Sequence, residues 1–147
     1  MIVVVAQAVD AAQQALAAEH AALYAYGVSG GVVDPASAEG VRALDAYAAH
    51  RTRRDRLEDA VQDLGGEPVA AEPGYALPGP VTTTATAIRL AVRVEDRCAA
   101  AYAQLVASST GRLRRDAIDW LTDSATRGLD WGAEPTAFPG LVDPPRP

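Results

Sequence analysis

The sequence predicts an all-α fold, a bundle of four helices arranged as two antiparallel hairpins. Apolar residues recur at spacings of three and four in four segments, and glycine and proline separate these segments. The 147-residue chain is 49% hydrophobic, much of it alanine, and only 5% aromatic. Such a composition favours closely packed helices over a β-sandwich, which needs alternating β-branched and aromatic residues. A chain of this length fits one domain with one core.

The four predicted helices cover residues 4–29, 37–64, 82–108 and 112–131. Gly30 and Gly31 end the first helix, because glycine commonly follows a helix terminus. Ser37 or Asp34 is expected to cap the second helix, and threonines 82–84 are expected to cap the third. A tight break at Thr110 and Gly111 precedes the fourth.

Residues 132–147 form a tail with five prolines that is expected to be extended. Phe138 and Leu141 are its predicted anchors on the bundle. The single domain therefore covers residues 1–147.

The connections between the helices predict their topology. The short links between helices one and two, and between three and four, require antiparallel neighbours. Residues 65–81 are different, because they contain four prolines and cannot be helical throughout. About 16 extended residues reach roughly 50 Å, whereas a helix of about 25 residues is about 38 Å long. We expect a crossover along the bundle, as in ferritin-like folds.

Charged and polar residues interrupt three of the apolar stripes. Glu19 lies between Leu16 and Leu23 in the first helix, and Glu95 interrupts the stripe of the third. In the second helix the stripe Ala43, Tyr47, His50, Arg54, Leu57, Val61, Leu64 contains a histidine and an arginine. A carboxylate in a core is costly unless it is paired with a cation or a metal.

The polar residues of the stripes lie near the middle of their helices, so they are expected to meet at one level. This predicts a central polar site made of Glu19, His50, Arg54 and Glu95. Arg54 is expected to form a bidentate pair with a glutamate, because its planar guanidinium matches a carboxylate. Side chains expected to surround this site are His20, Tyr24, Tyr47, Tyr102 and Arg127.

Four short segments carry a resemblance to a known family. Residues 18–27 (AEHAALYAYG), 50–55 (HRTRRD), 94–96 (VED) and 137–141 (AFPGL) are similar to a bacterial ferritin-like family without an assigned function. The resemblance implies a ferritin-like four-helix fold, with Glu19 and Glu95 at the positions of the single glutamates of di-iron bundles. The two Glu-x-x-His motifs of such centres are absent from residues 50–55 and 116–123.

Three functions are compatible with this pattern. The first is a non-catalytic bundle with no cofactor, in which a buried carboxylate–arginine network replaces a degenerate metal site. The second is a divergent carboxylate oxidase that binds iron or manganese through Glu19, Glu95, His50 and one of Asp119 or Asp123. The third is a bundle that binds a small molecule near His20, Tyr24 and His50.

Charge and chain start limit the partners. With 19 acidic residues, 13 arginines and no lysine, the net charge is −6, which argues against nucleic-acid and anionic-membrane partners. The apolar start lacks a basic region and stops at Asp10, so a cytoplasmic protein is expected. The single cysteine, Cys98, excludes an internal disulfide and a thiolate metal cage. A homodimer is expected from apolar residues outside the stripes, namely Val41, Leu44, Leu90 and Ile118.

Overall fold

The computed structural model describes residues 1–142, except the side chains of Ile2 and Val4. It contains four long helices, α1 Ile2–Gly30, α2 Ala38–Asp63, α3 Thr84–Ser108 and α4 Gly111–Asp130. These bounds differ from those predicted by at most two residues. The described residues include no strand, so the predicted all-α class is confirmed.

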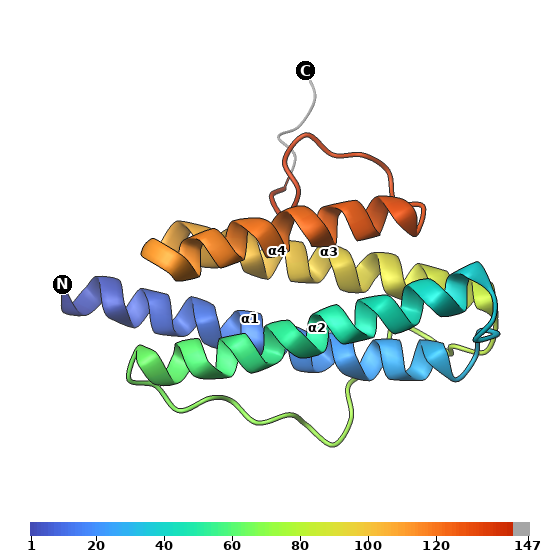
Figure 1. The fold of residues 1–147 in the computed structure, drawn as a ribbon, viewed down its shortest axis with the longest axis horizontal. Coiled ribbons are helices and arrows are strands. Elements are labelled where there is room, and N and C mark those ends of the chain that lie inside the picture. Colours follow the sequence, from blue (N-terminus) through green and yellow to red (C-terminus); the bar gives the residue numbers. More distant parts are fainter. Residues whose placement is uncertain (143–147) are drawn as a thin grey trace.

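The helices form two antiparallel hairpins, α1–α2 and α3–α4, joined by a long crossover (Figure 1). Residues 64–83 run back along the bundle from the end of α2 to the start of α3, so α2 and α3 point the same way. The predicted topology of two hairpins and one crossover is therefore confirmed. The crossover is held to α1, because the Gln13 amide exchanges hydrogen bonds with the backbone of Glu67 and Val69.

Two of the expected helix caps are present. The Ser37 hydroxyl accepts a hydrogen bond from the Gly40 amide at 3.0 Å. Thr83 and Thr86 form a reciprocal capping box at the start of α3. Gly111 has φ +60° at the break before α4, a conformation that favours glycine.

The two long faces of the bundle differ in how their helices meet. α1 packs closely against both α2 and α3, whereas the backbones of α2 and α4 rarely approach each other. Both helices bury small side chains, including Ala15 and Ala91, and their backbones approach closely. The larger apolar side chains of the core, Leu16, Leu57, Tyr102 and Leu105, lie deep between the helices.

The tail is attached to the bundle by its backbone and not by the predicted side chains. Phe138 is 59% exposed and Leu141 is 57% exposed, so the prediction that they anchor the tail was wrong. Gly140 lies against α3 instead, with φ +79°. A Cβ atom there would be 2.4 Å from the Ala99 carbonyl oxygen, so only glycine fits this contact. Residues 143–147 of the predicted tail lie outside the described residues.

Within the part of the chain that the structure describes, no helix has an apolar stretch long enough to cross a bilayer.

Candidate functional site: a buried histidine–carboxylate network

Three of the four predicted central residues meet in the middle of the bundle. Glu19 comes from α1, His50 from α2 and Glu95 from α3, and all three side chains are almost completely buried. Each interrupts an apolar stripe, so the helix periodicity itself turns it inward. The site therefore combines both hairpins at one level of the bundle.

His50 bridges the two glutamates. Its Nδ1 lies 2.7 Å from Glu19 Oε2, and its Nε2 lies 3.2 Å from Glu95 Oε1. Both ring nitrogens can donate to the carboxylates only when the imidazole is protonated. The geometry therefore matches an imidazolium held between two carboxyl groups.

An aromatic pair extends this network towards the end of α4. The Trp131 Nε1–H donates to the Tyr26 hydroxyl at 3.0 Å, and that hydroxyl donates to Glu95 Oε1 at 2.5 Å. The Tyr26 ring also stacks on the His50 ring, with a centroid distance of 5.4 Å. Glu95 thus accepts hydrogen bonds from two neighbours, which favours its ionised form.

The pKa shifts of the three central groups separate their roles. Burial alone would lower the pKa of His50, but hydrogen bonds with Cys98, Glu19 and Glu95 raise it well above its ordinary value. Burial raises the pKa of Glu19, and the hydrogen bond from His50 only partly opposes this. For Glu95 the effect of burial is outweighed by His50 and Tyr26, and its pKa is lowered. The cluster thus favours protonated His50 with ionised Glu95, while Glu19 is the carboxyl that takes up a proton more easily.

The position predicted for Arg54 was wrong. Its guanidinium pairs with the neighbouring Asp55 at 2.6 Å on the outside of α2, and the side chain is 31% exposed. The buried arginine is Arg53, which contacts Ser124 and Asp123 of α4. The stripe that α2 buries contains Ala46 and Arg53 in place of Tyr47 and Arg54, and successive residues point about 100° apart around the helix.

Most of the surrounding residues named from the sequence do not reach the site. His20 is buried, but its ring contacts the Val69 carbonyl oxygen of the crossover at 3.0 Å. Tyr24 and Tyr47 are each 37% exposed. Tyr102 is buried beneath the Arg53 guanidinium, which lies 5.7 Å from the centre of its ring.

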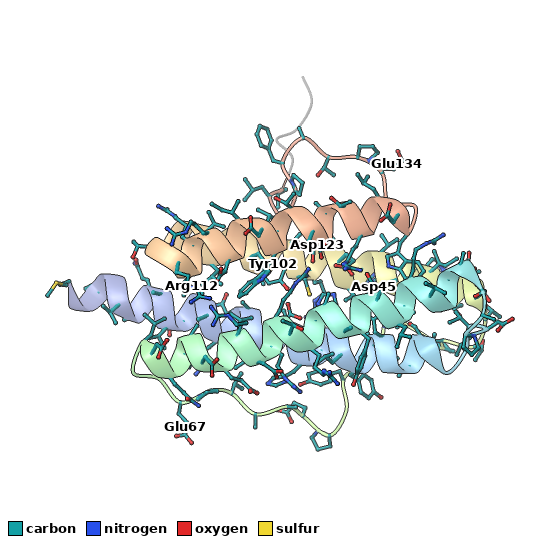
Figure 2. All side chains as sticks on the ribbon, in the orientation of Figure 1. Asp45, Glu67, Tyr102, Arg112, Asp123 and Glu134 are labelled. Atoms are coloured by element: carbon teal, nitrogen blue, oxygen red, sulfur yellow. The ribbon has the colours of Figure 1, made fainter. Side chains whose placement is uncertain are left out.

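Charged residues of α4 point to α2 and not to the glutamates. Arg127 pairs with Asp123 at 2.7 Å and with Asp45 at 2.8 Å, and Figure 2 labels both aspartates on this side of the bundle. Asp119 is exposed. The prediction that Arg127 surrounds the central site was therefore wrong. Neither Asp119 nor Asp123 supplies a ligand atom to that site.

Cys98 also lies at the central site, although the sequence did not predict it there. Its thiol and ligand atoms of Glu19 and His50 all lie within 4.8 Å of one another. Burial raises the pKa of the thiol to about 11, so it is protonated at neutral pH. The signal was present, because Glu95 and Cys98 have the i, i+3 spacing of a Glu-x-x-His motif with a thiol in place of the imidazole. Tyr26 also belonged to the first apolar stripe, seven residues after Glu19.

Residues 11–143 match the family model of a domain of unknown function, DUF4439, and this range includes the whole central network. The chain belongs to this family. A crystal structure of a conserved hypothetical protein, rv2844, from Mycobacterium tuberculosis is similar to the DUF4439 chain described here. The two are 35% identical over 86% of this chain and 95% of the other, with a TM-score of 0.81. No curated protein matches this DUF4439 sequence.

Proposed function

We propose that this DUF4439 protein is a non-catalytic ferritin-like bundle with a structural or interaction role, in which a buried histidine–carboxylate network takes the place of a two-metal centre. The observation that carries the proposal is the bridging position of His50 between Glu19 and Glu95, at 2.7 and 3.2 Å. Three features support a ferritin-like origin: the two hairpins, the long crossover, and the single glutamates on α1 and α3.

The residues present do not fit a two-metal centre. Such a centre takes a Glu-x-x-His motif from each of two helices, in addition to the single glutamates. On α2, Tyr47 stands three residues before His50, and its side chain is partly exposed. On α4, the buried residues beside Glu95 are Ser124 and Gly128, which offer neither a carboxylate nor an imidazole.

The network has a clear structural role in this proposal. One imidazolium forms hydrogen bonds with a carboxyl group from each hairpin. These bonds favour one alignment of α1, α2 and α3 along the bundle axis. Removing one partner of a buried ion pair costs roughly 3–5 kcal/mol, because the other charge stays buried without compensation. A catalytic metal ligand would behave differently, since its removal abolishes metal binding and leaves the helices packed.

The test combines thermal melts with metal analysis. Glu19→Gln and Glu95→Gln are purified from cultures supplemented with iron and manganese, and their melting temperatures and metal contents are measured. The proposal expects large losses in melting temperature and no stoichiometric metal in the parent protein. Asp96→Asn is the matched control, because Asp96 is exposed and adjacent to Glu95 on α3. Stoichiometric metal that is lost in variants with unchanged melting temperatures would overturn the proposal.

A single-metal site is a second candidate function. It is supported by the clustering of Glu19, His50 and Cys98 donor atoms within 4.8 Å and by two carboxylate oxygens, Glu19 Oε1 and Glu95 Oε2, that have no hydrogen-bond partner among the described residues. A mixed set of oxygen, nitrogen and sulfur donors suits zinc or cobalt better than iron or manganese. Binding would have to displace protons from His50 and from the Cys98 thiol, which opposes it near neutral pH.

Cobalt titration separates the two candidates. If the single-metal site is occupied, Co²⁺ gives a thiolate-to-cobalt charge-transfer band in the parent protein, and the band is absent from Cys98→Ala. If the histidine–carboxylate network binds no metal, no such band appears in either protein. Cys98→Ala leaves the contacts of His50 with both glutamates in place, so its melting temperature is expected to fall less than those of Glu19→Gln and Glu95→Gln.

We also propose self-association through the outer face of α2. Val41 and Leu44 are exposed there, one turn apart. Leu90 does not contribute, because it is buried in the core, and the prediction that it lies outside was wrong. Light scattering should give a dimer mass for the parent and a monomer mass for Leu44→Asp, whereas a monomeric parent contradicts the proposal.

A further inference from the structure

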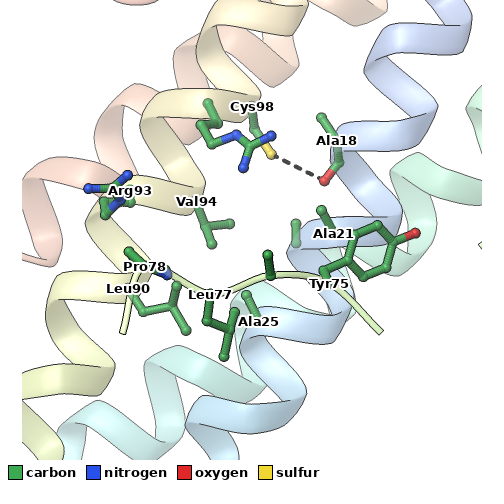
Figure 3. Close-up of a pocket in the computed structure, with 13 residues that line it drawn as sticks. Ala18, Ala21, Ala25, Tyr75, Leu77, Pro78, Leu90, Arg93, Val94 and Cys98 are labelled. Carbon is green, nitrogen blue, oxygen red and sulfur yellow. Dashed lines mark hydrogen bonds between the residues drawn. The ribbon is translucent and has the colours of Figure 1, made fainter. Parts of the chain in front are cut away.

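A groove lies between α1 and α3, beneath the crossover (Figure 3). Its volume is about 390 Å³, which falls within the range of about 300–1,000 Å³ found for small-molecule pockets. Leu77 and Pro78 of the crossover form one wall, and they face Leu90 and Val94 of α3. The groove is separate from the α2–α4 side of the bundle.

Small side chains create the space in this groove. The α1 wall consists of alanines, including Ala18, Ala21 and Ala25, where longer side chains would fill the volume. Cys98 lies at the inner end of the groove, beside the central network. The surface offered by these residues is mainly apolar, so it suits a hydrocarbon chain.

Arginines give the groove a charged rim. Arg93 and Arg97 line it, and both are exposed. Arg89 continues the same row one turn earlier, because the three residues are spaced by four along α3. Within residues 1–142, no carboxylate lies within 4.0 Å of any of these three guanidinium groups. The chain has a net charge of −6, and arginines of α2 and α4 form ion pairs with aspartates. The arginine row of α3 differs from them in this respect.

The crossover over the groove is held in place before any ligand arrives. Tyr75 packs on Tyr24 of α1 with a centroid distance of 5.7 Å, and its hydroxyl accepts a hydrogen bond from the Glu72 amide. The His20 contact with Val69 fixes the same segment a few residues earlier. A preformed wall lowers the ordering cost of binding.

We propose that this groove binds a small amphipathic carboxylate of the medium-chain acyl type, with its hydrocarbon chain along the α1 alanines and its carboxylate at Arg93 and Arg97. A planar guanidinium pairs with a carboxylate through two parallel hydrogen bonds, and two arginines one turn apart can hold one head group. A cationic amphiphile would be repelled by the same rim. A neutral one would lose the charge-assisted contacts.

The test uses decanoate as the probe and isothermal titration calorimetry as the measurement. Decanol and decyltrimethylammonium serve as the neutral and cationic counterparts with the same hydrocarbon chain. Decanoate is expected to bind the parent protein, and its affinity should fall by about tenfold for each of Arg93→Gln and Arg97→Gln. Arg115→Gln is the matched control, because Arg115 is an exposed arginine of α4 remote from the groove, and it should leave the affinity unchanged.

Filling the groove tests the position of the hydrocarbon chain. Ala21→Leu adds volume at a half-buried groove residue and should abolish decanoate binding. Ala17→Leu makes the same change at an exposed position of α1 and should leave binding intact. The proposal is overturned if decanoate does not bind the parent protein, if decyltrimethylammonium binds as well as decanoate, or if both arginine variants keep the parent affinity.

Discussion

The α1–α3 and α2–α4 sides of the bundle are held together by different forces. On the α1–α3 side, alanines let the backbones approach closely, and the contact is mostly apolar apart from the hydrogen bond between Tyr26 and Glu95. On the α2–α4 side the backbones stay apart, and arginines bridge the gap to aspartates, as in Arg127–Asp45 and Arg56–Asp116. Helix separation decides which contacts each side can form, because only long side chains span the wider interface. His50 lies where the two sides meet.

The largest effect on stability is expected from replacing His50. His50→Leu should destabilise the fold by roughly 3–5 kcal/mol, because it leaves two buried carboxyl groups without their common partner. Urea unfolding measures the loss. The triple variant His50→Leu/Glu19→Met/Glu95→Met should regain most of it, since replacing a whole buried charged cluster by apolar residues is often neutral or stabilising. If the triple variant is no more stable than the single one, packing of the imidazole and not its charge is what matters.

The α1–α3 side should respond strongly to added volume. Ala91→Leu places a larger side chain where the helices are in close contact and should cost about 1–3 kcal/mol. The same substitution at Ala100, which is exposed on α3, should have little effect on the melting temperature. Equal stability of the two variants would show that the alanine interface is loosely packed.

The pH dependence of stability reports on the charge at the centre. The folded chain holds the His50 proton above the ordinary pKa of 6.5, whereas the unfolded chain releases it near that pH. Stability should therefore fall as the pH rises above 6.5, by about 1.4 kcal/mol per pH unit until the folded pKa is reached. The raised pKa of Glu19 contributes with the same sign from about pH 4.5 upwards.

This dependence can be measured by urea unfolding at several pH values between about 6.5 and 8.5. The lowered pKa of Glu95 stabilises the fold above pH 4.5 and does not alter the slope in this range. His50→Gln should remove most of the slope. Because Glu19 contributes with the same sign, the decisive comparison is between Glu19→Gln and Glu19→Gln/His50→Gln, and equal slopes in these two variants would mean that His50 is neutral in the folded protein.

The smallest effect is expected on the α2–α4 side. Asp45→Asn removes one exposed partner of Arg127 and should cost about 0.2–1 kcal/mol, because Asp123 still pairs with the guanidinium. Raising the salt concentration should reduce this difference further. A loss as large as that of Ala91→Leu would mean that the ion pairs, and not the alanine contacts, dominate the stability of the bundle.

Sequence reasoning was most successful where the pattern is local. Glycines and prolines mark the helix ends, and a run of proline-containing residues long enough to span the bundle predicts the crossover. Glu19, His50 and Glu95 could be placed in one layer, because each interrupts an apolar stripe near the middle of its helix. These inferences need only helix periodicity and chain length.

The errors arose where the neighbouring helix decides which side chain is inside. The spacing of three and four residues places Tyr47 and Arg54 in the stripe, whereas α2 buries Ala46 and Arg53. Arg53 can be buried because the wide gap to α4 accommodates it and supplies Asp123 and Ser124. The gap itself is a property of tertiary packing, and no single-helix pattern reports it. The backbone contact of Gly140 was similarly invisible, because it depends on the neighbouring Ala99 carbonyl.

The separation of the network residues along the chain has a consequence for the order of folding. Glu19 and His50 are 31 residues apart and belong to the first hairpin, whereas Glu95 is 45 residues beyond His50, across the crossover. Contacts between nearer residues close smaller loops and form earlier. The first hairpin can thus pair its histidine with one glutamate while water still hydrates both groups. Dehydration then coincides with arrival of the second hairpin, which makes hairpin docking the step that commits the chain to its native state.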